Sequence, residues 1–134
     1  MTIDTSTGTS TGAARAEVGD DTWVTVCAAT LLTPDRGVAA LVHGRAVAVF
    51  ALSTGGLHAI DNIDPCSGAS VLSRGMIGDV DGFATVASPM YKQRFDLCTG
   101  CCLDSPGLSV AVHDVTSVGG MIHVRLRPVA AVVR

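Results

Sequence analysis

Two short stretches decide how this sequence is interpreted: Asn62-Ile63-Asp64-Pro65-Cys66-Ser67-Gly68 and Ser88-Pro89-Met90-Tyr91-Lys92-Gln93-Arg94-Phe95. Each contains a small polar residue followed at once by a proline, a pair that is typical of turns. One such pair carries little information. Two pairs, with Gly68 three residues after the first proline and Phe95 six residues after the second, predict two related loops at the tips of neighbouring hairpins.

The spacing of these loops matches a Rieske iron–sulfur site. There, C-P-H-x-G and C-P-x-H-G-x-x-F supply two thiolates to one iron and two imidazoles to the other. In this sequence the four ligand positions hold Asp64, Cys66, Ser88 and Tyr91. A carboxylate, a thiol and two hydroxyls do not have the ligand softness that such a cluster needs. The sequence therefore predicts the framework of the site without its metal.

Length and composition predict one domain and exclude several partners. The chain has 134 residues, 48% of them hydrophobic, and a net charge of -3. That charge gives no reason to expect nucleic acid or acidic lipid as a partner. No apolar run approaches the roughly 20 residues that a membrane helix needs. We expect a disordered leader over 1–20, a Rieske-like domain over 21–128 and an apolar tail over 129–134.

The expected location is the cytoplasm, because residues 1–20 have neither the basic start nor the apolar run of a secretion signal. The five cysteines are then expected to be free thiols.

The hydrophobic pattern favours an all-β fold. Alternating or β-rich runs recur between turn signals, which is typical of a small antiparallel sandwich or barrel. The expected strands lie at 23–27, 38–42, 46–52, 57–60, 83–87, 94–97, 108–112 and 121–126. A hairpin turn is expected at 43–45 and a short helix within 69–74.

Three motifs together resemble a known family. They are Asp64-Pro65-Cys66-Ser67-Gly68-Ala69-Ser70-Val71-Leu72-Ser73-Arg74-Gly75, then Ala87-Ser88-Pro89-Met90-Tyr91-Lys92-Gln93-Arg94-Phe95, then Gly100-Cys101-Cys102-Leu103-Asp104. They are similar to the small subunit of assimilatory NAD(P)H-dependent nitrite reductase, a Rieske-like domain that lacks the cluster ligands. The similarity extends from about Trp23 to about Leu126. Cys66 departs from the family, in which an aromatic residue is usual.

The resemblance implies a role in reducing nitrite to ammonium, within nitrate assimilation. It implies a large-subunit partner that carries FAD, an iron–sulfur cluster and siroheme. This chain would carry no cofactor and no catalytic residue, and would support activity or assembly by contact. Since the second loop keeps its scaffold without a cluster, we expect a docking surface there. The candidate docking residues are Arg74, Lys92, Gln93 and Arg94.

Two alternatives come from the residues themselves. Cys66, Cys98, Cys101 and Cys102 could form a metal or redox site, since C-x-x-C occurs in both. The chain could also be a ligandless module for a different reductase or oxygenase. The histidines in strand-like segments, which include His58 and His113, are expected on solvated faces.

Overall fold

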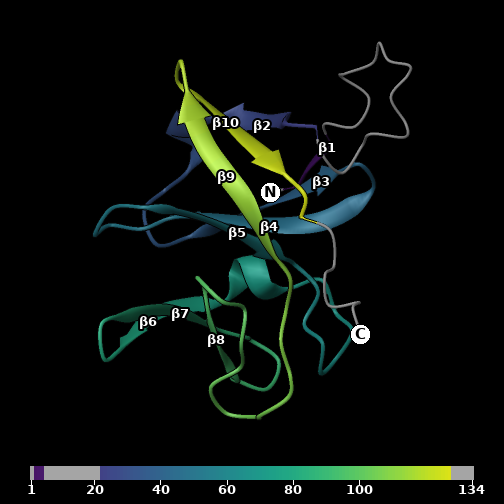
Figure 1. Ribbon diagram of the computed structural model, residues 1–134, viewed down its shortest axis with the longest axis vertical. Coiled ribbons are helices and arrows are strands. Elements are labelled where there is room, and N and C mark those ends of the chain that lie inside the picture. The colour runs from purple at the N-terminus through teal and green to yellow at the C-terminus, as the bar shows by residue number, and fades with distance from the viewer. Residues whose placement is uncertain (1, 5–21, 128–134) are drawn as a thin grey trace.

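The described part of the chain, residues 2–4 and 22–127 of a computed structural model, forms two sheets (Figure 1). The larger sheet has the strand order β1-β3-β4-β5-β9-β10-β2, and the smaller has the order β6-β7-β8. The strands are β1 (Thr2–Asp4), β2 (Val24–Ala28), β3 (Gly37–Val42), β4 (Arg45–Ala51), β5 (Leu57–Asp61), β6 (Met76–Val80), β7 (Phe83–Ala87), β8 (Arg94–Asp96), β9 (Val112–Val118) and β10 (Met121–Arg125). The described residues also form two short 3-10 helices, η2 (Ala29–Leu31) and η3 (Leu72–Arg74).

The β3–β4 hairpin shows how the sequence specifies the large sheet. Its turn consists of His43 and Gly44, with φ angles of 52° and 81°. A two-residue turn with both φ angles positive has the twist that antiparallel strands require. The register therefore pairs Val42 with Arg45 and continues to Gly37 opposite Phe50. The hairpin turn expected at 43–45 is confirmed.

Strand β4 contributes to two hydrophobic cores, because its side chains alternate between the faces of the sheet. Val47 and Val49 pack into the core enclosed by the large sheet. Ala48 and Phe50 pack into a second core, between the large sheet and the small one. This second core also holds Leu72 of η3 and residues of the small sheet, so it joins the two sheets. In Figure 1, η3 lies between them.

The second core sets the positions of the two loops. The first loop, residues 62–71, follows β5 and leads into η3, while the second, residues 88–93, joins β7 to β8. Phe95, the second residue of β8, follows the second loop closely and is fully buried in this core. Each loop therefore ends at an element that packs into the second core, the first at η3 and the second at β8.

The all-β prediction is confirmed, and the short helix expected within 69–74 is present as η3. The expected leader over 1–20 includes one described element, since β1 pairs in parallel with β3. Without it, β3 would be an edge strand with open backbone groups. Residues 5–20 and the predicted tail over 129–134 lie outside the described residues. No helix in the described ranges is long and apolar enough to cross a membrane.

Candidate functional site

The tips of the two loops are joined by a buried hydrogen bond. The hydroxyl of Ser88 donates to Oδ2 of Asp64 at 2.5 Å. The backbone N–H of Cys66 donates to Oδ1 of the same carboxylate at 2.7 Å. Asp64 is 0% exposed and Ser88 1%. Two residues that the motif places at cluster-ligand positions thus bind each other.

A second bond between the loops uses the thiol of Cys66. The side-chain amide of Gln93 donates from Nε2 to Sγ of Cys66 at 3.1 Å. The other amide atom of Gln93, Oε1, is buried with no hydrogen-bond partner among the described residues. Gln93, predicted as a docking residue, is therefore directed at the first loop.

The remaining ligand position, Tyr91, is exposed to 61% of its surface. It lies in a tight turn, in which Ser88 N–H donates to the carbonyl of Gln93 at 2.9 Å and Lys92 N–H to that of Ser88 at 2.8 Å. Lys92 has a φ of 63°. No described residue pairs with its ammonium group, so Tyr91 and Lys92 both present free side chains to solvent.

These residues do not fit a [2Fe-2S] cluster. Asp64 and Ser88 bond each other, Cys66 is the one thiol of the set, and no imidazole is present. Oxygen donors are a poor match for iron that thiolates and imidazoles normally hold. Across residues 22–127, no group of three or more His, Cys, Asp or Glu side chains is arranged to hold a metal ion.

Arg94 links the end of the second loop to the segment after β8 that contains Asp104. Its Nη2 and Nε atoms contact the two carboxylate oxygens of Asp104 at 2.7 and 3.1 Å, and its backbone N–H donates to Oδ2 at 2.8 Å. These hydrogen bonds, with the charge of Arg94, lower the pKa of Asp104 to about 2. The guanidinium of Arg94 is therefore engaged within the chain, unlike the ammonium of Lys92.

Large apolar side chains surround the joined loops. Leu103 lies beside them, because its N–H donates to the carbonyl of Arg94 at 2.8 Å. We call the following five residues the loop end: Ile63, Met90, Tyr91, Lys92 and Leu103. Its four apolar members are each between 41% and 61% exposed. An exposed cluster of aromatic, Met and aliphatic side chains is typical of an interaction surface.

Arg74 does not belong to this cluster. It lies at the end of η3 and lines a hollow of about 640 Å³ with Arg36 and Met76. No residue of the second loop lines that hollow. The structure thus separates the four predicted docking residues: Lys92 is free at the loop end, Gln93 and Arg94 bond within the chain, and Arg74 lies elsewhere.

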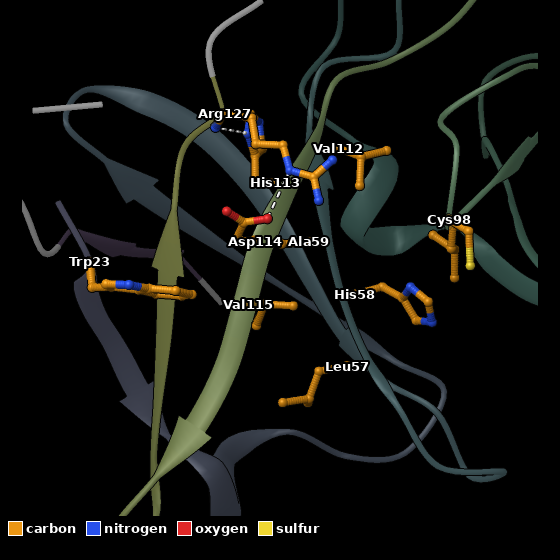
Figure 2. A pocket seen from close by; sticks show the side chains of 11 residues that line it. Trp23, Leu57, His58, Ala59, Cys98, Val112, His113, Asp114, Val115 and Arg127 are labelled. Carbon is orange, nitrogen blue, oxygen red and sulfur yellow. Dashed lines mark hydrogen bonds and ion pairs between the residues drawn. The ribbon is translucent and has the colours of Figure 1, made fainter. Parts of the chain in front are cut away.

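A separate groove of about 450 Å³ runs along β5 and β9, between Trp23 and Cys98 (Figure 2). The ring of His58 lies on its Cys98 side in Figure 2. Burial lowers the pKa of His58 and outweighs the opposite effects of the Leu97 backbone and the charge of Asp96. The neutral imidazole is therefore favoured.

His113 is buried beneath this groove, which corrects the expectation of a solvated position. Its Nε2 lies 2.9 Å from Oδ1 of Asp61, and its Nδ1 accepts the backbone N–H of Arg127 at 3.2 Å. Arg45 also bonds Asp61, at 2.9 Å. Burial alone would raise the pKa of Asp61, but the hydrogen bonds from His113 and Arg45 and their charges lower it. The network connects β4, β5 and β9 to the segment just after β10, which is a structural role.

The cysteines are dispersed. Cys98 and Cys101 are exposed on the turn after β8, whereas Cys102 is buried in the second core. Cys27 is buried in the first core, and burial raises its pKa. The C-x-x-C therefore has no described third ligand, and no observation favours the metal alternative over a structural role.

Comparisons with known proteins agree with the Rieske-like fold. The family model of the Rieske-like [2Fe-2S] domain matches residues 22–125. A nitrite reductase (NADH) small subunit of Salmonella typhimurium is 40% identical over 104 residues, which cover 77% of this chain and 96% of that protein. A crystal structure from Mycobacterium tuberculosis, assigned as an NADH-dependent nitrite reductase small subunit, is 46% identical. It has a TM-score of 0.77 and covers 81% of this chain and 97% of that one.

One further relative has a different organisation. The nitrite reductase [NAD(P)H] large subunit of Klebsiella oxytoca is 34% identical over 102 residues. This similarity covers 76% of the present chain but only 11% of the Klebsiella protein. There, a domain similar to this chain is part of the large polypeptide.

Proposed function

This chain belongs to the Rieske-like [2Fe-2S] domain family, among the NADH nitrite reductase small subunits, and we propose that it is the cluster-free small subunit of such a reductase. It binds the large subunit and supports reduction of nitrite to ammonium by contact. The resemblance of its motifs implies that FAD, an iron–sulfur cluster and siroheme belong to the large subunit. The observation that carries the proposal is the Asp64–Ser88 hydrogen bond, at the place where a cluster would be held.

The Klebsiella protein supports the choice of partner. A domain that is covalently linked to the rest of a polypeptide is kept close to it, at a high effective concentration. A separate small subunit has no such link and has to bind the large subunit through its surface. This chain presents a suitable surface at the loop end. The aromatic ring of Tyr91 and the side chain of Met90 are types enriched at interfaces. Lys92 adds a positive charge that no described residue pairs.

We propose that the loop end contacts the large subunit. Replacing Tyr91→Ala together with Lys92→Glu is expected to weaken binding to the large subunit by at least about tenfold. The change removes an aromatic contact and brings a carboxylate to a site that accepts an ammonium group. The measurement is the dissociation constant of the purified pair, with NADH-dependent nitrite reduction as a second readout.

A matched control is available at the turn between β9 and β10. Figure 1 shows this turn at the opposite end of the molecule from the small sheet. Ser117 and Val118 are exposed there, so Ser117→Glu with Val118→Glu changes the net charge by the same two units. The control should bind like the wild type. Equal binding by the loop-end variant, with an unchanged circular dichroism spectrum, would show that this end is not the docking surface.

A further inference from the structure

The hollow beside η3 contains Arg36 and Arg74, the two described arginines for which no other described residue provides a side-chain partner. We call it the arginine hollow; it is lined by Asp35, Arg36, Gly37, Ser73, Arg74, Gly75, Met76 and Ile77. Arg36 directly precedes β3 and Arg74 ends η3. These elements are distant in sequence but lie in contact, since a Cβ at Gly37 would be 2.5 Å from the carbonyl oxygen of Ser73.

The other four described arginines form ion pairs with aspartates. Arg45 pairs with Asp61, Arg94 with Asp104, and both Arg125 and Arg127 with Asp114. Within residues 22–127, Arg36 and Arg74 make no side-chain hydrogen bond or ion pair. Asp35 also lines the hollow, but its Oδ1 accepts the backbone N–H of Ser53 at 2.8 Å. The hollow thus presents two unpaired guanidinium groups.

The residues beside Arg74 have structural roles that Arg74 lacks. Leu72 is fully buried. The N–H of Ser73 donates to Oδ1 of Asn62 at 2.6 Å and so fixes the first loop. Gly75 is packed so closely that a Cβ there would lie 2.4 Å from the carbonyl oxygen of Ala87. Packing therefore explains Leu72 and Gly75 of the V-L-S-R-G motif, whereas no contact among the described residues explains the side chain of Arg74.

The composition of the hollow indicates the kind of ligand. Guanidinium groups form planar, paired hydrogen bonds with carboxylates, and two of them in one hollow suit an acidic segment. Met76 is 77% exposed beside them. Met and Arg are both enriched at protein interfaces, and Met adapts to varied apolar partners.

We propose that the arginine hollow binds an acidic segment of the large nitrite reductase subunit. Carboxylates of that segment pair with Arg36 and Arg74, and an apolar neighbour packs on Met76. This inference rests on the proposed function and adds a second contact, because none of the loop-end residues lines the hollow.

The test compares four forms of the chain for binding to the purified large subunit, at low and at high salt. Arg36→Ala with Arg74→Ala should weaken binding at least about tenfold at low salt and should reduce its dependence on salt. Arg36→Lys with Arg74→Lys keeps the charge but loses the planar fork, so a loss of about threefold is expected. The control is again Ser117→Glu with Val118→Glu, which matches the change in net charge of the double alanine variant.

The outcomes separate the two proposals. If the wild type binds and the double alanine variant binds equally well, the arginine hollow is not a contact, while the small-subunit assignment stands. If the control loses as much affinity as the alanine variant, net charge is responsible and the hollow proposal fails. Saturable binding of inorganic phosphate that needs both arginines, with unchanged affinity for the large subunit, would also overturn it. A wild-type chain that does not bind the large subunit would remove both proposals.

Discussion

Replacing Asp64 with alanine is expected to lower the free energy of unfolding by about 3 kcal/mol. The carboxylate accepts the Ser88 hydroxyl and the Cys66 N–H in a fully buried position. Alanine leaves these donors without an acceptor, and each unsatisfied buried group costs about 1–3 kcal/mol. Urea unfolding monitored by circular dichroism measures the change. Hydrogen exchange should also become faster in both loops, because their direct bond is lost.

The control for this substitution is Asp79→Ala. The Asp79 carboxylate also accepts a backbone N–H, that of Gly82 at 3.2 Å, but it is exposed. Its loss should change stability by no more than about 0.5 kcal/mol. Equal effects of the two substitutions would contradict a loop junction built on Asp64.

Replacing Gly100 with alanine should destabilise the fold by about 4 kcal/mol. Its φ of 81° is in the left-handed region, which costs an alanine about 1–2 kcal/mol. A Cβ at Gly100 would also lie 2.0 Å from the carbonyl oxygen of Val110. Forcing atoms into a packed site adds about 1–3 kcal/mol. Because the N–H of Val110 donates to Gly100 at 2.9 Å, the turn after β8 would be displaced from the segment before β9.

Gly44→Ala is a matched control for the steric part of this cost. Gly44 has the same φ of 81° but no atom within 4 Å of an added Cβ. Only the conformational cost of about 1–2 kcal/mol is then expected. Thermal or denaturant unfolding of both variants gives the difference. If the two glycines prove equally costly to replace, the close approach at Gly100 does not constrain the fold.

Much of the fold follows from local patterns. The runs that became β3, β4 and β7 are β-rich and bounded by turn residues, so their positions were predictable. The pairing of the loop tips was also predictable, because the spacing of Pro65, Pro89 and the neighbouring polar residues matches one scaffold. In these cases one local signal and the tertiary structure agree.

Other elements lack a local signal. In strand β6, apolar and polar residues alternate only weakly and most side chains are exposed, so no local pattern in Met76–Val80 predicts a strand. Its strand conformation depends on pairing with β7. The strand expected at 108–112 is wrong in position. Strand β9 runs instead over Val112–Val118, where polar residues interrupt the hydrophobic pattern. Its position is set by pairing with β5 and β10. Tertiary pairing overrides propensity there.

The candidate site was predicted only in part, since its contacts join distant segments. The motif placed Asp64 and Ser88 together, but not the direction of Gln93 or the pairing of Arg94 with Asp104. Arg36 was not selected at all, because only the packing of β3 against η3 brings it to the hollow of Arg74. The spacing of residues in a local motif does not predict which charged side chains from distant segments lie close together.

The central claim is that this subunit keeps a Rieske-like scaffold without a cluster. It is tested most directly by measuring iron and acid-labile sulfide in the full chain, expressed with iron available and purified without oxygen. We expect a colourless protein with far less than one iron per chain, because Asp64 and Ser88 bond each other and Tyr91 is exposed. A reddish-brown protein with about two irons and two sulfides per chain, the content of a Rieske cluster, would contradict it.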